Sequence, residues 1–288
     1  MVILLAIFKN ISAMLIFGSI GLFVRHIDLA SSQIALVRAL IGTAVLLSAM
    51  FFMKKSFDFS ACRKNALILL ISGSTIGFNW IFLFQAYHYT TIAVATLTYY
   101  LAPTIVMLVS PFFLSERFTL RKLICVILSL IGLMLLADIF TGLNSGVGSM
   151  QGVIYGICAA VFYACVIISN KFLHDIPAMD STIAQLIIAA LILLPYVTFQ
   201  NNNWYIDIVS MLPLLTVGII HTGFAYLLYF SSLQNLSAQT AALFSYIDPV
   251  TAVLLSMLIL TEPISPIQGL SAALIFGSLL VSQFFTDK

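Results

Sequence analysis

The chain has 288 residues, of which 62% are hydrophobic and 8% are charged, and its formal net charge is +2. A soluble domain has about half apolar and a quarter charged residues, so this composition excludes a soluble globular protein. With a mean hydropathy of +1.14, the chain is predicted to be an all-α integral membrane protein. A net charge so close to zero indicates no particular partner, and we expect no nucleic acid among the partners.

Apolar runs follow one another along the whole chain, and a bilayer needs about 20 apolar residues for each helix that crosses it. Polar breaks divide the runs into ten predicted transmembrane helices: 4–24, 33–53, 66–87, 91–114, 119–138, 150–170, 181–199, 210–232, 237–260 and 267–285. The first run follows no basic segment and precedes no small-residue cleavage site. It is therefore interpreted as a membrane span and not as a signal peptide.

Basic residues predict the orientation, because cytoplasmic loops carry an excess of lysine and arginine. Nine of them fall in segments on one side of the predicted bundle: Lys54, Lys55, Arg63, Lys64, Arg117, Arg121, Lys122, Lys171 and Lys288. Arg25 alone falls on the other side. Both termini are therefore expected on the cytoplasmic side of the cell membrane.

Two stretches of the chain match each other at a fixed offset (249 − 103 = 146). The matched pairs are Gly77 and Gly223, Phe78 and Phe224, Tyr100 and Tyr246, Pro103 and Pro249, and Glu116 and Glu262. Five matches in register indicate a duplication, with residues 1–140 and 141–288 as the two repeats. Each repeat holds five predicted spans, an odd number, so the second copy must be inverted relative to the first. Inverted repeats are typical of secondary transporters.

The matched stretches also resemble a known family. Residues 79–136, which contain FLFQAYHYTTIAVATLTYYLAPTIVMLVSPFFLSERF, resemble the EamA domain of the drug/metabolite transporter superfamily. The second copy, with AYLLYFSSLQNLSAQTAALFSYIDPVTAVLLSMLILTEP, resembles it as well or better, and IALVRAL at 34–40 is similar to the family's second helix. The resemblance implies ten helices in two inverted five-helix repeats. It also implies export or exchange of small metabolites.

Asp248 is the strongest functional candidate, because it carries the only charge between Ser237 and Leu260. A carboxylate near the centre of a bilayer costs about 2.5–3.5 kcal/mol, so it needs a partner, a cavity or a substrate. Its match in the first repeat is Ala102 (248 − 146), so the charge does not belong to a symmetric scaffold. Asp248 is predicted to bind a proton or a competing cation. The alternative is a hydrogen-bonded aspartate that ties its helix to a neighbour.

His221 and Arg38 are the other polar candidates inside predicted spans. His221 lies at a depth similar to that of Asp248, and the two could form a proton-relaying pair; alternatively, His221 is a satisfied packing residue. Arg38 could bind a substrate carboxylate or pair with Asp28 or Asp248, and a general structural or gating role is the alternative.

Spans 3, 4, 8 and 9 hold the aromatic and polar side chains that lipid would reject, so they are predicted to line a cavity. The candidate lining residues are Asn79, Trp80, Tyr99, Tyr100, Tyr226 and Tyr246, each of which could equally serve helix packing. Pro103 and Pro249 remove backbone donors and act either as hinges or as static kinks. Glu116 and Glu262 are interpreted as structural, favouring the start of the following helix that Thr119 or Ser265 caps.

Several classes of function lack their motifs. The chain has no phosphate-cradling glycine loop, metal-ligand cluster or Ser–His–Asp set, so no cofactor and no enzymatic activity are expected. Spans 7 to 10 contain no lysine or arginine, which disfavours a phosphate-bearing substrate. We expect a monomer or homodimer in the lipid bilayer that transports a small molecule. The alternative is a membrane scaffold or receptor-like protein that kept the repeat and lost transport.

Overall fold

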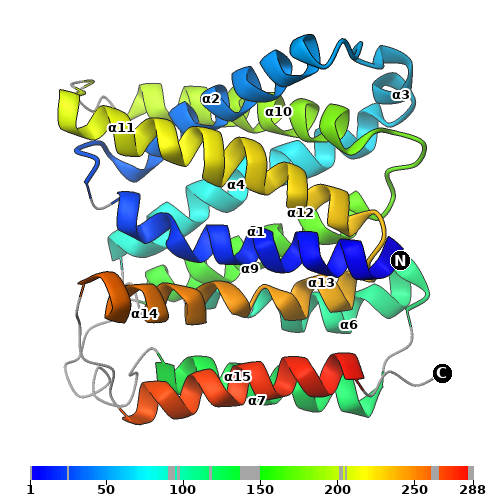
Figure 1. The fold of residues 1–288 in the computed structure, drawn as a ribbon, viewed down its shortest axis with the longest axis vertical. Coiled ribbons are helices and arrows are strands. Elements are labelled where there is room, and N and C mark those ends of the chain that lie inside the picture. Colours follow the sequence, from blue (N-terminus) through cyan, green and yellow to red (C-terminus); the bar gives the residue numbers. More distant parts are fainter. Residues whose placement is uncertain are drawn as a thin grey trace.

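The computed structural model describes residues 2–24, 26–89, 95, 98–116, 119–136, 150–200, 204, 206–260 and 266–284. Within these ranges the secondary structure is helical, and the helices lie alongside one another in stacked layers (Figure 1). In chain order they are α1 (Val2–Val24), α2 (Ser31–Phe52), α3 (Phe59–Lys64), α4 (Ala66–Tyr89), α6 (Ala102–Leu114), α7 (Leu120–Leu136), α9 (Met150–Asn170), α10 (Ala178–Phe199), α11 (Ile208–Thr216), the π-helix η2 (Val217–Phe224), α12 (Ala225–Leu233), α13 (Ala238–Phe244), α14 (Ile247–Leu260) and α15 (Pro266–Phe284).

Within the described ranges, six helical segments are long and apolar enough to cross a membrane. They are Val2–Val24, Ser31–Phe52, Ala66–Ala86, Met150–Asn170, Ala178–Phe199 and Ile208–Leu233, the last of which joins α11, η2 and α12. The predicted all-α membrane protein is thereby confirmed. The other predicted spans correspond to α6, α7, the pair α13 and α14, and α15. The count of ten spans stays a prediction.

The packing of the helices follows one scheme in both halves of the chain. α4 packs along α9 and α10, while η2 and α12 pack along α1 and α2. α6 packs on α9, and α14 packs on α1. α7 and α15 pair with each other at one edge of the bundle, at the bottom of Figure 1. These contacts of α4 and α6 thus have counterparts in the second half, in those of η2, α12 and α14.

α1 and α9 run in opposite directions. Asn10, in the first half of α1, donates through Nδ2 to Ser232 Oγ at 2.8 Å. Lys171 directly follows the last residue of α9. Its Nζ donates to the backbone carbonyl oxygen of Leu233, the residue after Ser232. The start of α1 and the end of α9 therefore lie at the same end of the bundle, which also carries α3 and is called the α3 end (Figure 1).

Small residues allow the backbones of α4 and α10 to approach closely. A Cβ added at Gly73 would lie 2.6 Å from the Cβ of Ile188, and one at Gly77 would lie 2.9 Å from the Cβ of Ile192. Both distances are too short for real carbon atoms, so each glycine is required by packing. The Gly-x3-Gly pair is therefore used inside this chain, as small residues are at membrane helix contacts.

Charged side chains at the α3 end bond to the free backbone groups of neighbouring helix ends. The Glu116 carboxylate accepts from the backbone N–H groups of Ala238 at 2.7 Å and Gln239 at 3.2 Å, at the start of α13. Lys171 Nζ donates to the carbonyl oxygens of Leu233 at 2.8 Å and Leu236 at 2.7 Å. A carboxylate suits a helix start and an ammonium suits a helix end, because each complements the local dipole.

The predicted partner of Glu116 was wrong. The sequence pointed to the next helix along the chain, α7, but Glu116 bonds to α13 from the other half. Thr119 does cap α7, since its Oγ1 accepts from Lys122 N at 3.3 Å. Arg25, Arg117, Glu262, Ser265 and Lys288, which entered the predictions of orientation and capping, lie outside the described residues.

Burial also changes the pKa of Lys171. Loss of water around its ammonium group lowers the pKa of Lys171 below that of an ordinary lysine, and the nearby Glu116 carboxylate opposes the shift. The two carbonyl oxygens and the nearby carboxylate replace part of the hydration that the ammonium group loses on burial.

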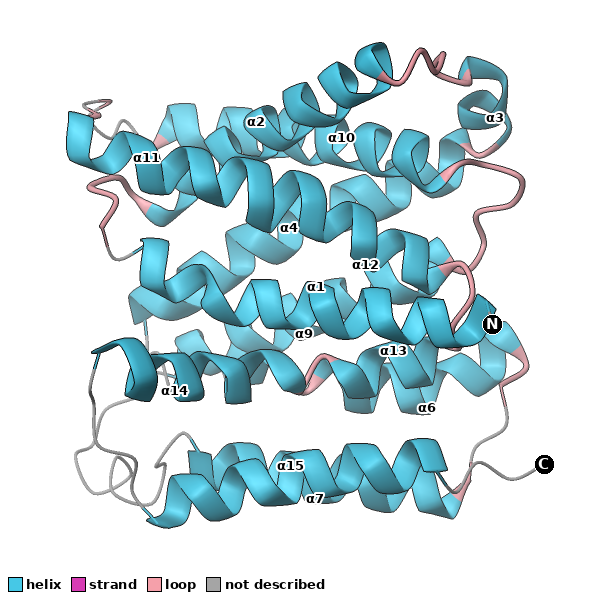
Figure 2. Ribbon diagram, viewed as in Figure 1, coloured by secondary structure: helices cyan, strands magenta, loops and turns pink. Residues whose placement is uncertain are grey.

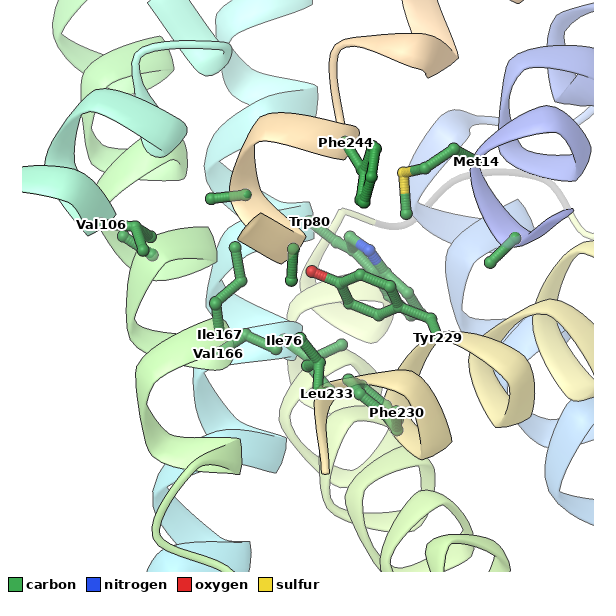
Figure 3. Packing of buried hydrophobic residues seen from close by; sticks show 14 of the residues in the cluster. Met14, Ile76, Trp80, Val106, Val166, Ile167, Tyr229, Phe230, Leu233 and Phe244 are labelled. Atoms are coloured by element: carbon green, nitrogen blue, oxygen red, sulfur yellow. The ribbon is translucent and has the colours of Figure 1, made fainter. Parts of the chain in front are cut away.

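One buried cluster joins helices from both halves of the chain. Met14, Trp80, Tyr229 and Phe244 come together from α1, α4, α12 and α13 (Figure 3). The cluster continues through Ile167 and its neighbours on α9. It therefore lies where the first five predicted spans meet the last five.

Candidate functional site

The predicted span at 237–260 is interrupted next to Asp248. α13 ends at Phe244, Ser245 and Tyr246 form a turn, and α14 begins at Ile247 (Figure 2, loop between α13 and α14). Pro249 follows in the first turn of α14, where its missing N–H group is tolerated. The sequence predicted Asp248 halfway along a continuous helix. It instead sits in the first turn of a new helix, where the dipole favours a carboxylate.

The first half contains the same kind of break. Tyr100 and Leu101 form a turn, α6 begins at Ala102, and Pro103 lies in its first turn. The Leu101 N–H group donates to the carbonyl of Thr98 at 3.2 Å, which closes the turn. Both prolines chosen from the sequence therefore mark helix starts that follow a turn.

The two breaks are in contact through a pair of tyrosines. The rings of Tyr100 and Tyr246 stack at 6.0 Å between centroids with 27° between their planes. The Tyr246 hydroxyl donates to the backbone carbonyl of Tyr100 at 3.2 Å. The Tyr100 side chain is in turn the hydrogen-bonding partner of the Asp248 carboxylate. Asp248 keeps accessible surface, although Tyr246, Ile247, Pro249 and Val250 around it are buried.

Aromatic side chains extend from the breaks towards the middle of the bundle. Tyr99 stacks on Tyr163 of α9, with ring centroids 5.3 Å apart. The hydroxyl groups of Tyr163 and Tyr229 are 3.1 Å apart and hydrogen-bonded. Phe17 of α1 packs edge-on against both Tyr229 and Tyr226. Phe17 was not among the residues chosen from the sequence.

These rings are called the aromatic wall: Phe17, Trp80, Tyr99, Tyr100, Tyr163, Tyr226, Tyr229 and Tyr246. Arg38, on α2, lies next to it. Its guanidinium carbon is 4.2 Å from the centroid of the Trp80 ring, a cation–π contact. Its Nη2 is 3.5 Å from the Tyr226 hydroxyl, and its buried Nε has no hydrogen-bond partner. Trp80 and Tyr226 are themselves in edge contact, with centroids 5.9 Å apart.

The structure does not bring His221 and Asp248 together. His221 Nε2 is 3.0 Å from the Ser19 hydroxyl of α1, and Nδ1 is 3.3 Å from the carbonyl of Thr216. Both ring nitrogens are thus occupied, and the proposed Asp–His pair is not formed. His221 lies inside η2, where the wider winding lets its ring reach the carbonyl five residues earlier. π-helical segments often occur at functional sites.

Asn79 also has a structural partner. Its side chain is buried, and Nδ2 donates to the backbone carbonyl of Ala159 at 2.7 Å. The bond ties α4 to α9 where the two helices pack tightly. Asn79 therefore holds α4 against α9, the helices that carry Trp80 and Tyr163.

Three pairs of rings at the site are related by the sequence offset, and the charged residues are not. Trp80 and Tyr226 are separated by 146 positions, as are Tyr100 and Tyr246, and both pairs touch. Phe17 and Tyr163 have the same separation. The offset positions of Arg38 and Asp248 are Ala184 and Ala102. Applying the offset of 146 to every aromatic residue would have found these three pairs from the sequence, but not Tyr99 and Tyr229, whose offset positions are Ser245 and Leu83.

Metal binding has no basis in the described residues, because no group of three His, Cys, Asp or Glu side chains in them could hold an ion. The charged and aromatic groups that meet there can instead bind an organic molecule through ionic, hydrogen-bonding and stacking contacts. A helical membrane bundle with broken helices around such a site has the build of a membrane transporter.

Comparison with known proteins gives the family. The model of the EamA-like transporter family matches residues 3–137 and again 150–283, and the chain belongs to this family. It is 30% identical over 285 residues to the uncharacterized transporter YxxF of Bacillus subtilis, covering 96% of this chain and 89% of that protein. It is 24% identical to the uncharacterized inner membrane transporter YicL of Salmonella typhimurium, covering 93% of this chain and 92% of that one.

A solved crystal structure shares the fold. It superposes with a TM-score of 0.84 at 20% sequence identity and covers 96% of this chain and 97% of that chain. The chain is therefore a multi-pass integral membrane transporter of the EamA family and not an enzyme. Its partners are a small-molecule substrate and the membrane.

Proposed function

We propose that this protein is a secondary active transporter that exports small metabolites by alternating access. The substrates are amino acids, or amphipathic or aromatic compounds or cations, and transport is coupled to protons through Asp248. The observation that carries the proposal is the position of Asp248. It lies in the first turn of a broken helix, beside a wall of aromatic side chains, and retains accessible surface deep within the bundle.

The proposed architecture is ten helices in two inverted five-helix repeats, 1–140 and 141–288, in the cell membrane with both termini cytoplasmic. Three observations support it. α1 and α9, the first helices of the two repeats, run in opposite directions. The helix contacts of one half have counterparts in the other. Residues 146 positions apart touch at Tyr100 with Tyr246 and at Trp80 with Tyr226, as expected only near a two-fold axis.

In this proposal the substrate binds on that axis, between the repeats. Exchange of conformations between the halves would open the site first to one side of the membrane and then to the other. Pro103 and Pro249 serve as hinges, because each lies just after a turn whose backbone is not part of a continuous helix.

Asp248 serves as the proton-binding group. Its carboxylate is bonded to Tyr100 and keeps accessible surface, so a proton and a substrate can compete for it. A substrate or cation that enters next to Asp248 would displace the proton from the carboxylate. When the substrate or cation leaves, Asp248 would bind a proton again. The gradient would thereby drive net flux.

The test is transport in proteoliposomes with a panel of amino acids and organic cations, with and without a pH gradient. Asp248→Asn should abolish accumulation driven by the gradient and should spare exchange of substrate for substrate. If Asp248→Asn still concentrates substrate against the same gradient, the coupling role is wrong. If the wild-type protein moves no member of the panel in either mode, the scaffold alternative is favoured over transport.

A further inference from the structure

Arg38 is a permanently charged group inside a membrane helix. Within the part of the chain that the structure describes, no carboxylate forms an ion pair with Arg38. Asp28, one predicted partner, is exposed and bonds to Ser210 through its backbone N–H. Asp248, the other, faces Tyr100. Neither predicted ion pair of Arg38 is formed.

The contacts that Arg38 makes hold it in place and leave Nε, on its hydrogen-bonding edge, without a partner. Trp80 lies under the guanidinium at 4.2 Å, and Tyr226 approaches Nη2 at 3.5 Å. Nε is buried without a partner. A buried donor without a partner is costly, and a guanidinium carries five donors in a fixed plane. Stacking on the ring fixes that plane, and Nε on its edge lacks an acceptor.

A carboxylate is the group that matches this edge. Two parallel N–H···O bonds between guanidinium and carboxylate are short, charge-assisted and geometrically specific. A phosphate with two charges fits less well, because the helices that pack beside α2 (α10, η2, α4 and α11) bring no further lysine or arginine. An ammonium group is repelled by the like charge. His221, the other ionisable group near Arg38, is bonded through both ring nitrogens.

The surroundings of Arg38 indicate the rest of the ligand. Phe17 and Tyr226 are in edge contact at 5.3 Å, and Tyr229 lies next to Phe17 at 6.1 Å. Tyr226 and Phe17 are both partly accessible, so their rings can receive an apolar group. Aromatic faces and edges favour a planar or bulky hydrocarbon body over a small hydrophilic one.

We propose that Arg38 is the receptor for the carboxylate group of the transported molecule, an amphipathic carboxylic acid or amino acid whose apolar body lies against Phe17, Tyr226 and Tyr229. This proposal rests on the proposed transport function and names the chemical group that the site selects. Trp80 positions the guanidinium, and Tyr226 lies beside the bound carboxylate. The carboxylate end of the ligand then lies on the side of α2, and the remainder extends towards Asp248.

The experiment measures equilibrium binding to the purified full-length protein in lipid nanodiscs by calorimetry. The probes are 3-phenylpropanoate, which carries only the carboxylate, phenethylamine, which carries only the ammonium group, and phenylalanine, which carries both. Arg38→Gln should weaken binding of 3-phenylpropanoate and phenylalanine by at least about tenfold, because a bidentate ionic contact is lost. Binding of phenethylamine should not weaken, since that probe makes no contact with the guanidinium and the variant removes a like charge.

Two further variants keep the result interpretable. Arg38→Lys retains the charge and loses the planar fork, so it should weaken binding of both carboxylate probes by several-fold. It replaces Arg38→Gln in the experiment if that variant does not fold. Lys9→Gln is the matched control, because it removes one positive charge from α1 without touching the aromatic wall. It should leave all three affinities unchanged.

The proposal is overturned if both carboxylate probes bind Arg38→Gln as tightly as wild type, or if neither binds wild type at millimolar concentration. It is also overturned if phenethylamine binds wild type and the carboxylates do not. Carboxylate binding that depends on Arg38, without any flux in proteoliposomes, would support the receptor and count against the proposed transport function. The two failures can therefore be told apart.

Discussion

The charged groups at the α3 end and those at the middle of the bundle are held in opposite ways. Glu116 and Lys171 are each bonded to two backbone groups of a neighbouring helix end. Arg38 has an unbonded Nε and no acidic partner within the described residues, and Asp248 relies on a tyrosine hydroxyl. Charges satisfied by the backbone stabilise the fold, whereas charges left incomplete are available to a ligand. The following predictions test that distinction.

Replacing Glu116 should produce the largest loss of stability. Glu116→Ala leaves the N–H groups of Ala238 and Gln239 without their charged acceptor, which should cost about 3 kcal/mol because charge-assisted bonds are lost. The measurement is thermal unfolding of the purified protein in detergent, followed by intrinsic fluorescence. Ligand affinity of the folded fraction should not change. Equal stability of wild type and Glu116→Ala would show that Glu116 does not stabilise the fold.

Replacing Lys171 should have a smaller effect of the same kind. Lys171→Met keeps the apolar stem and removes the bonds to the carbonyls of Leu233 and Leu236, at a cost of about 1–2 kcal/mol because water can replace part of the lost contact. The double variant with Glu116→Ala should be less destabilised than the sum of the single variants, since the two charges interact. Strict additivity in the same unfolding assay would contradict that coupling.

Replacing Arg38 should leave stability nearly unchanged. Arg38→Met removes a cation–π contact and also a charge that has no acidic partner in the described part of the chain, so the two effects should cancel to within about 1 kcal/mol. Thermal unfolding of Arg38→Met and Glu116→Ala side by side makes the comparison direct. A loss for Arg38→Met as large as that for Glu116→Ala would mean that Arg38 is architectural and would break the distinction.

Cys62 should report the side of the membrane that the α3 end faces. Burial, with the nearby Asp180 and Asp58 carboxylates, raises the pKa of the Cys62 thiol, so less thiolate is present at neutral pH and alkylation should be slow. The rate should rise with pH up to the raised pKa, and Asp180→Asn should increase it at neutral pH by removing a negative charge.

The assay uses a variant that keeps Cys62 as its single cysteine, in intact cells and in inside-out vesicles. A membrane-impermeant maleimide should label only the vesicles if the α3 end is cytoplasmic. Labelling of intact cells would reverse the predicted orientation.

The repeat made much of the site predictable. The offset that relates Pro103 to Pro249 also relates Tyr100 to Tyr246 and Trp80 to Tyr226, and these residues do meet. The partners of single polar residues could not be predicted in this way. His221 bonds to Ser19 and Asn79 to the carbonyl of Ala159, because the helices that carry them pack on α1 and α9, which lie far away in the sequence.

By itself the sequence determined the membrane class, the helical secondary structure and the candidate residues Asp248 and Arg38. Hydrophobicity over about 20 residues and an isolated charge within it are local properties, so they can be read without knowing the fold. Only the tertiary structure decided that Asp248 lies in the first turn of a helix, that Glu116 caps a helix of the other half, and that Arg38 pairs with no carboxylate among the described residues. Each of these depends on which distant backbone or side chain comes within bonding distance, and that is fixed by the packing of the helices.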